Sequence, residues 1–107
     1  MSTKTAKTMY DAALSATITT TLYTAPALTP GAIVACITLA NTNTTTARIV
    51  TIDFGATKTL LPAITLLPNE SRVIFLNRAM TTGQTIRGGQ STGTDVECSI
   101  SGYEFSA

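Results

Sequence analysis

The sequence predicts an all-β protein: an antiparallel β-sandwich or a jelly-roll-like barrel of seven to eight short strands. Threonine, which is β-branched and suits a pleated, half-buried surface, supplies 23 of the 107 residues. Polar residues alternate with Ile, Val and Leu over most of the chain, whereas the strong helix formers are scarce. Turn signals recur about every 8–12 residues, which is typical of sandwiches and small barrels.

The chain divides into an arm and one domain. We expect residues 1–10 to form a flexible or partner-ordered N-terminal arm, and residues 11–107 to form a single β-sandwich domain. In the first half, Pro26 ends a short strand, and Val50, Ile52 and Phe54 alternate as the inward face of a later one. The strands expected there cover residues 14–19, 21–24, 32–40 and 48–54.

Proline and glycine punctuate the second half of the chain. Pro62 interrupts an apolar run, so that run is expected to be an edge strand or a strand that enters at a bend. Pro68 is expected at the second position of a type I turn. Gly88 and Gly89 are expected to form another turn. The strands expected here cover residues 60–67, 71–76, 85–87 and 95–103.

Several strands are apolar on both faces. Val34 and Cys36 lie on the face opposite to Ile33, Ala35, Ile37 and Leu39, and Ile74 and Leu76 lie opposite to Val73 and Phe75. A half-exposed antiparallel strand should be apolar on one face only. Either both faces are covered within a closed sandwich, or the second face is buried by a neighbouring subunit.

The two cysteines are expected to be reduced thiols that act as small hydrophobic residues. Strict alternation places Cys36 on the second face of its strand and Cys98 on the core face of the last strand, with Val96 and Ile100. A disulfide between them would need a one-residue bulge.

Charge and hydropathy limit the classes of partner. The formal net charge is +1 and charged residues make up 12% of the chain, with no basic run, so we expect no nucleic-acid partner. No segment approaches the ~18 apolar residues of a membrane span, and the first ten residues lack the apolar core of a secretory signal. We therefore expect no membrane partner.

The side chains offer little catalytic chemistry. There is no histidine, which excludes the usual Ser-His-Asp and Cys-His sites. Asp95, Glu97 and Glu104 gather near the last strand, but a solvated face or salt bridges to arginine explain them better than a glycosidase pair does. We expect no enzyme activity, no cofactor and no metal site.

Five short segments stand out along about residues 20–104. They are LYTAPA (22–27), LANT (39–42), LPNE (67–70), TGQTI (82–86) and VECSISGYE (96–104). In this order they resemble segments of the small β-sandwich virion structural proteins of tailed bacteriophages, notably capsid decoration or cement proteins.

This resemblance implies a non-enzymatic part of a phage virion, made in the host cytoplasm and present in many copies. A cement protein would sit between subunits of the major capsid protein, as a homo-oligomer and preferably a trimer, and stabilise the head. The alternative virion role is a tail, collar or fibre-associated adaptor that contacts other virion proteins.

Contacts with these partners are expected from the arm and from the second apolar faces. The candidate interface residues are Lys4, Lys7, Met9, Val34, Cys36, Ile74 and Leu76. A different class of function, a module that binds host-surface glycans, would use loops 41–46 and 88–94. The shortage of aromatic residues disfavours it.

Overall fold

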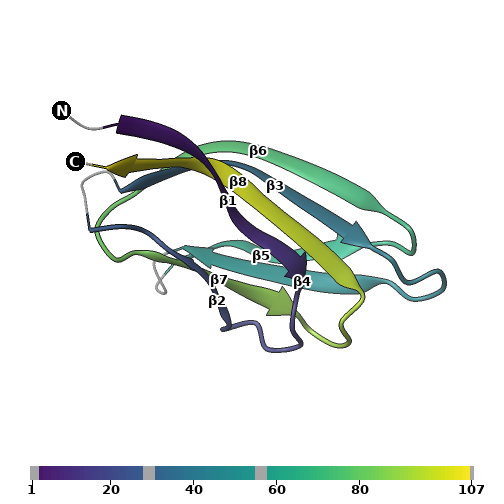
Figure 1. Cartoon of the computed structure of the whole chain (residues 1–107). Coiled ribbons are helices and arrows are strands. Elements are labelled where there is room, and N and C mark those ends of the chain that lie inside the picture. The colour runs from purple at the N-terminus through teal and green to yellow at the C-terminus, as the bar shows by residue number, and fades with distance from the viewer. Residues whose placement is uncertain (1–2, 28–30, 55–57, 107) are drawn as a thin grey trace.

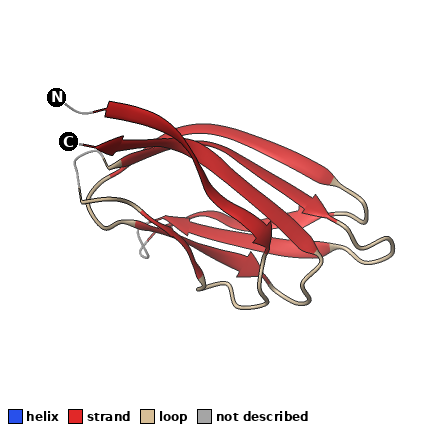
Figure 2. Ribbon diagram, viewed as in Figure 1, coloured by secondary structure: helices blue, strands red, loops and turns tan. Residues whose placement is uncertain are grey.

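The computed structural model is an all-β sandwich, and it describes residues 3–27, 31–54 and 58–106 (Figures 1 and 2). Two four-stranded sheets pack face to face, and every strand pair is antiparallel. Within the described residues no helix is long and apolar enough to cross a membrane. The strands are β1 (Thr3–Ala13), β2 (Thr21–Thr24), β3 (Ala32–Asn41), β4 (Arg48–Phe54), β5 (Lys58–Leu66), β6 (Ser71–Met80), β7 (Thr85–Gln90) and β8 (Val96–Ser106).

The sheet drawn uppermost in Figure 1 has the strand order β1-β8-β3-β6 and is called the upper sheet below; the lower sheet has the order β2-β7-β4-β5. The core lies between them and is made of aliphatic side chains together with Met9, Tyr23, Phe54, Met80 and Cys98. Val50, Ile52 and Phe54 point into this core, as their alternation predicts. The sandwich and the edge position of β5, which carries Pro62, are both confirmed.

The prediction of a flexible arm is wrong for residues 3–10. They belong to β1, which pairs with β8 from Thr3↔Ser106 to Ala13↔Glu97. A register shift between Thr8 and Tyr10 turns Met9 into the core, where 7% of its surface is exposed. β1 is therefore part of the domain, and the first two residues lie outside the described ones.

The structure also differs from the sequence prediction at residues 14–20 and at Gly88 and Gly89. Residues 14–20 form a loop and not a strand, with the buried side chain of Leu14 held in the core. Gly88 and Gly89 continue β7 and make no turn. A Cβ at Gly89 would lie 2.6 Å from the carbonyl oxygen of Thr17, so the 14–20 loop crosses this strand at a distance that only glycine allows.

A bulge in β3 changes which of its residues face the core. The register shifts between Val34 and Cys36 against both neighbouring strands. Val34 is consequently fully buried together with Ile37 and Leu39, while Ile33 and Cys36 lie on the outer face. The prediction that put Ile33 and Ala35 with the core residues, and Val34 opposite to them, is wrong because strict alternation does not pass through a bulge.

Candidate interaction surface

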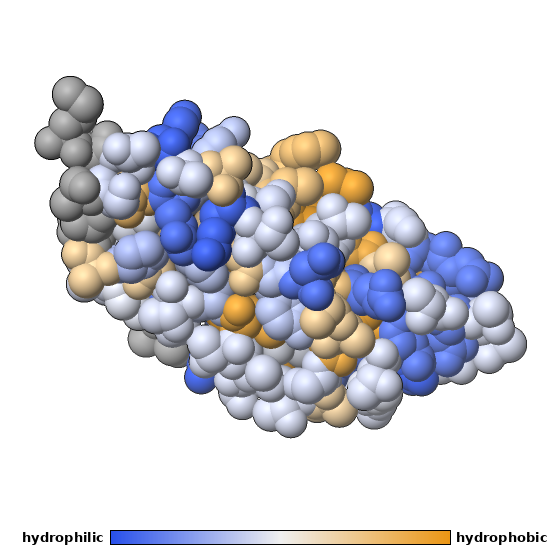
Figure 3. Space-filling view, in the orientation of Figure 1, coloured by the Kyte–Doolittle hydropathy of each residue, from blue (hydrophilic) through white to orange (hydrophobic). Residues whose placement is uncertain are grey.

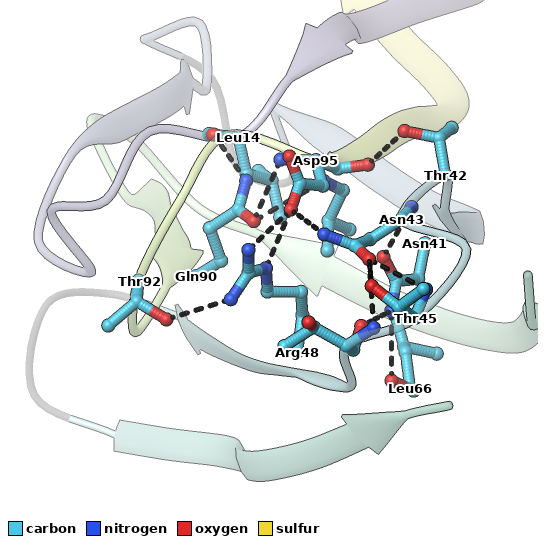
Figure 4. Close-up of polar contacts among 12 residues, drawn as sticks. Leu14, Asn41, Thr42, Asn43, Thr45, Arg48, Leu66, Gln90, Thr92 and Asp95 are labelled. Atoms are coloured by element: carbon cyan, nitrogen blue, oxygen red, sulfur yellow. Dashed lines mark hydrogen bonds and ion pairs between the residues drawn. The ribbon is translucent and has the colours of Figure 1, made fainter. Parts of the chain in front are cut away.

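A network of polar side chains lies at one end of the sandwich (Figure 4). There Gln90, at the end of β7, is fully buried. Its amide nitrogen donates to the Leu14 carbonyl at 2.6 Å, and its amide oxygen accepts from the backbone N–H groups of Asp95 and Val96 at 3.1 and 3.3 Å. This one side chain therefore joins the two ends of the β7–β8 turn to Leu14, which is distant in sequence.

Asn41 performs the same task at the end of β3. Its amide nitrogen donates to the carbonyls of Thr46, Leu66 and Leu67 at 3.0–3.2 Å, and its oxygen accepts from the Asn43 N–H. Such buried polar groups are costly unless every hydrogen bond is made. The asparagine thus fixes the 42–47 loop against the end of β5.

Asp95 connects this loop to the β7–β8 turn. One carboxylate oxygen accepts from the Asn43 amide at 2.9 Å and contacts the Arg48 guanidinium at 2.6 Å. The hydrogen bond from Asn43, followed by that from Arg48, holds the pKa of Asp95 below its ordinary value of 3.8. Asn43, in a glycosylation sequon, is thereby used in loop structure: its own oxygen accepts from the N–H groups of Thr45 and Thr46.

The named polar side chains of this end bind other groups of the chain itself. Among the described residues, no three His, Cys, Asp or Glu side chains lie close enough to hold a metal ion. None of the six Tyr and Phe residues of the chain falls in the 41–46 or 88–94 segments proposed for glycan binding. Of the three carboxylates singled out in the sequence, Asp95 binds Arg48 and Glu104 accepts from the Tyr23 hydroxyl at 2.5 Å, while Glu97 is exposed on β8. The structure does not bring them together as a catalytic pair.

The outer face of the upper sheet has the opposite character. Phe75 and Val73 of β6 are 81% and 49% exposed, and Tyr103 of β8 is 37% exposed. Cross-strand pairing places Cys36 beside Phe75 and Ile33 beside Tyr103. These five residues (Ile33, Cys36, Val73, Phe75 and Tyr103) are called the outer apolar face.

Figure 3 shows apolar atoms at the surface along the upper edge of the molecule, over β6. Exposure of this kind is unusual for a phenylalanine, and contiguous exposed apolar residues mark interaction sites. Two shallow hollows of about 310 and 320 Å³ lie on the same sheet, beside β8. Their outer linings include the small side chains of Ser99 and Ser101, flanked by residues of β1 and β3.

The structure corrects most of the predicted interface residues. Val34 and Met9 are buried in the core, so the prediction that they face a partner is wrong. Ile74 and Leu76 are half-buried and pack against the core from the inner face of β6, so they too are on the wrong face for docking.

Three of the predicted interface residues do lie at the surface. Cys36 is half-buried on the outer apolar face. Lys7 is exposed on β1, and Lys4 lies over the Tyr103 ring at 4.7 Å from its centroid. Whether they contact a partner stays a prediction.

Val73 and Phe75 were assigned to the wrong side because alternation alone cannot say which side of β6 faces inward. Over the predicted strand, residues 71–76, each side carries two large apolar residues and one polar one. No signal in the sequence of β6 decides between them.

The two cysteines lie on opposite faces of the upper sheet, as alternation predicts, and both are free. Cys98 is buried in the core, and burial, with a smaller contribution from Asp11, raises its pKa to about 12. This thiol is therefore a packing element and not a nucleophile.

Comparison with known proteins adds no family to this description. No protein-family model matches the chain, and no curated protein matches it.

Proposed function

We propose that this chain is a non-enzymatic structural protein of a phage virion, a capsid cement or decoration protein that binds between subunits of the major capsid protein. In this role it acts in the assembled particle after synthesis in the host cytoplasm. The proposal combines the resemblance of five sequence segments with the outer apolar face, and the exposure of Phe75 is the observation that carries it.

The physical basis is burial of apolar surface. Covering Phe75 would contribute about 1.5–3 kcal/mol, and covering Val73, half of which is already buried, about half as much, before the costs of association. The outer apolar face carries no formal charge, and the whole chain is nearly neutral at +1. Association would then depend on shape and apolar contact more than on electrostatic steering.

The direct test is the number of copies in purified particles of the phage that encodes the chain, measured by quantitative gel. A cement protein should be present at a copy number on the order of hundreds, because it follows the capsid lattice. About a dozen copies or fewer would support a tail, collar or fibre-associated adaptor instead. Absence from the particle would refute any virion role.

A second test examines the surface itself. Particles that lack the protein should take up the added wild-type chain, whereas Phe75→Lys should add poorly because it places a charge in the buried contact. Thr94→Lys, an exposed position in the polar end, is the matched control and should add normally. Equal uptake of both variants would show that the outer apolar face does not make the contact.

A further inference from the structure

The four edge strands of the sandwich differ in how well they are protected against pairing with another strand. β2 has only four residues, and β5 contains Pro62 and two register shifts. β1 carries lysines at positions 4 and 7 and a bulge at Met9. Short length, proline, bulges and lysine are the features by which natural sheets block edge-to-edge pairing. β6 has ten residues, no proline and the two most exposed apolar side chains of the upper sheet. Its register shift against β3 lies beyond Phe75, so the segment 71–75, with Arg72 as its one charge, is the least protected edge.

The backbone of β6 also has hydrogen-bonding groups turned to this free edge. The Asn41 N–H donates to the Glu70 carbonyl at 2.9 Å, which identifies that pair as a hydrogen-bonded one in the β3–β6 ladder. Because hydrogen-bonded pairs alternate along an antiparallel ladder, Arg72 and Ile74 turn their backbone groups to β3. Those of Val73 and Phe75 then face outward, and in the described part of the chain no strand pairs with that side of β6.

We propose that β6 pairs in antiparallel fashion with β6 of a second copy of this chain, about a twofold axis beside Ile74, and joins two upper sheets into one of eight strands. This register places Val73 opposite Phe75 of the second copy, and both residues have outward-facing backbone groups. Each of the two equivalent pairs exchanges both N–H···O=C bonds. The inference is independent of the virion role.

Charge favours this register over the two registers obtained by moving the twofold axis by one residue. With the axis beside Ile74, Glu70, which pairs with Arg72 of its own chain, lies opposite Arg78 of the second copy. Within the described residues Arg78 lies over the Phe54 ring and makes no ion pair of its own, so Glu70 could bind both arginines. An axis beside Phe75 would instead place Arg72 opposite Arg78, and like charges directly opposite are destabilising. An axis beside Val73 brings no opposite charges together and leaves Phe75 facing Ser71.

The paired strands would give the exposed phenylalanine a neighbour. Val73, Phe75 and their two symmetry mates would form a continuous apolar row across the joined outer faces, through cross-strand contacts. The contact is isologous and closes at two copies. A twofold contact of this kind differs from the threefold assembly that the phage resemblance implies, so the oligomeric state distinguishes the two.

The oligomeric state in solution tests the proposal. Sedimentation equilibrium of the whole chain should give a dimer that dissociates on dilution. Phe75→Lys should raise the dissociation constant at least about tenfold, because it replaces an apolar cross-strand contact with a charge in each of two symmetric pairs. Thr8→Lys, on the opposite edge of the same sheet, should leave it unchanged. A monomer at every concentration, a trimer, or equal effects of the two substitutions would overturn the proposal.

Cross-linking tests the register, with Cys36→Ser as the background. Ile74→Cys should form an intermolecular disulfide on mild oxidation, because facing residues of a non-hydrogen-bonded pair have Cα atoms about 4.5 Å apart. Phe75→Cys should not cross-link, since its symmetry mate would lie beyond the ~7 Å that a disulfide spans. Circular dichroism checks that both variants are folded. Cross-linking at position 75 alone, or at neither position in a folded protein, would overturn the proposed pairing.

Discussion

The polar end of the sandwich and the outer apolar face use their side chains in opposite ways. At the polar end, Asn41, Gln90 and Asp95 direct their polar groups at the chain's own backbone and side chains. On the outer apolar face, Phe75 and Val73 have large exposed surfaces and few contacts of their own. The polar residues of this end thus stabilise the fold. The outer apolar face, which has few polar groups, is the surface proposed for binding.

The largest effect on the free energy of unfolding is predicted at Gln90, in the polar end. Gln90→Leu keeps the volume but leaves one carbonyl and two N–H groups without partners in buried surroundings, which should lower the free energy of unfolding by about 3 kcal/mol or more. Urea unfolding followed by circular dichroism measures this change. Gln84→Leu is the control, since its side-chain oxygen accepts the Thr81 N–H in a turn, and should cost about 1 kcal/mol. Equal effects would mean that the buried network does not stabilise the fold as described.

A somewhat smaller loss is expected at Asn41. Asn41→Ala removes the donor to three carbonyls that lie near the surface end of the core, where water can replace part of the bonding. The expected loss is about 2 kcal/mol of unfolding free energy, again from urea titration. Asn77→Ala, an exposed position on β6, should change it by less than about 0.5 kcal/mol. If Asn41→Ala left the free energy of unfolding unchanged, the polar end would not stabilise the fold in the way that distinguishes it from the outer apolar face.

The sequence was sufficient to predict the sandwich, the edge position of β5 and the inward face of β4, because these follow from hydrophobic alternation and from Pro62. It could not locate the polar network, since Asn41 and Gln90 bind backbone groups that only the folded chain brings near. The bulge in β3 and the continuation of β7 through Gly88 are likewise set by neighbouring strands and not by local sequence. The exposed face of β6 was predicted on the wrong side of the strand, because within residues 71–76 the two sides have similar composition.

Acid provides a graded test of the polar end. The pKa of Asp95 is lowered by Asn43 and Arg48, so its ionised form stabilises the fold at neutral pH. This stabilisation is present above the ordinary pKa of 3.8 and is lost as pH falls through the lowered value in the folded state.

Urea titrations between about pH 5 and pH 2 should therefore show unfolding free energy decreasing with acid, less steeply in Asp95→Asn. The Asn substitution should not remove the slope completely. The pKa of Glu70 is also lowered, by the Leu67 N–H and then by Arg72, so Glu70→Gln should remove a further part. A slope unchanged by Asp95→Asn would refute the role of this carboxylate in holding the loops.

The smallest effect on stability is predicted where the effect on association should be large. Phe75→Thr exchanges an 81% exposed aromatic residue for one that suits a strand, so the free energy of unfolding of the monomer should change by less than about 0.5 kcal/mol. Phe54→Ala, the matched buried position in β4, should cost about 3–5 kcal/mol. Urea unfolding at low protein concentration keeps any contribution from association out of the comparison. If Phe75→Thr cost more than about 1 kcal/mol, the outer apolar face would be part of the folding core. Its exposure would then no longer indicate a partner.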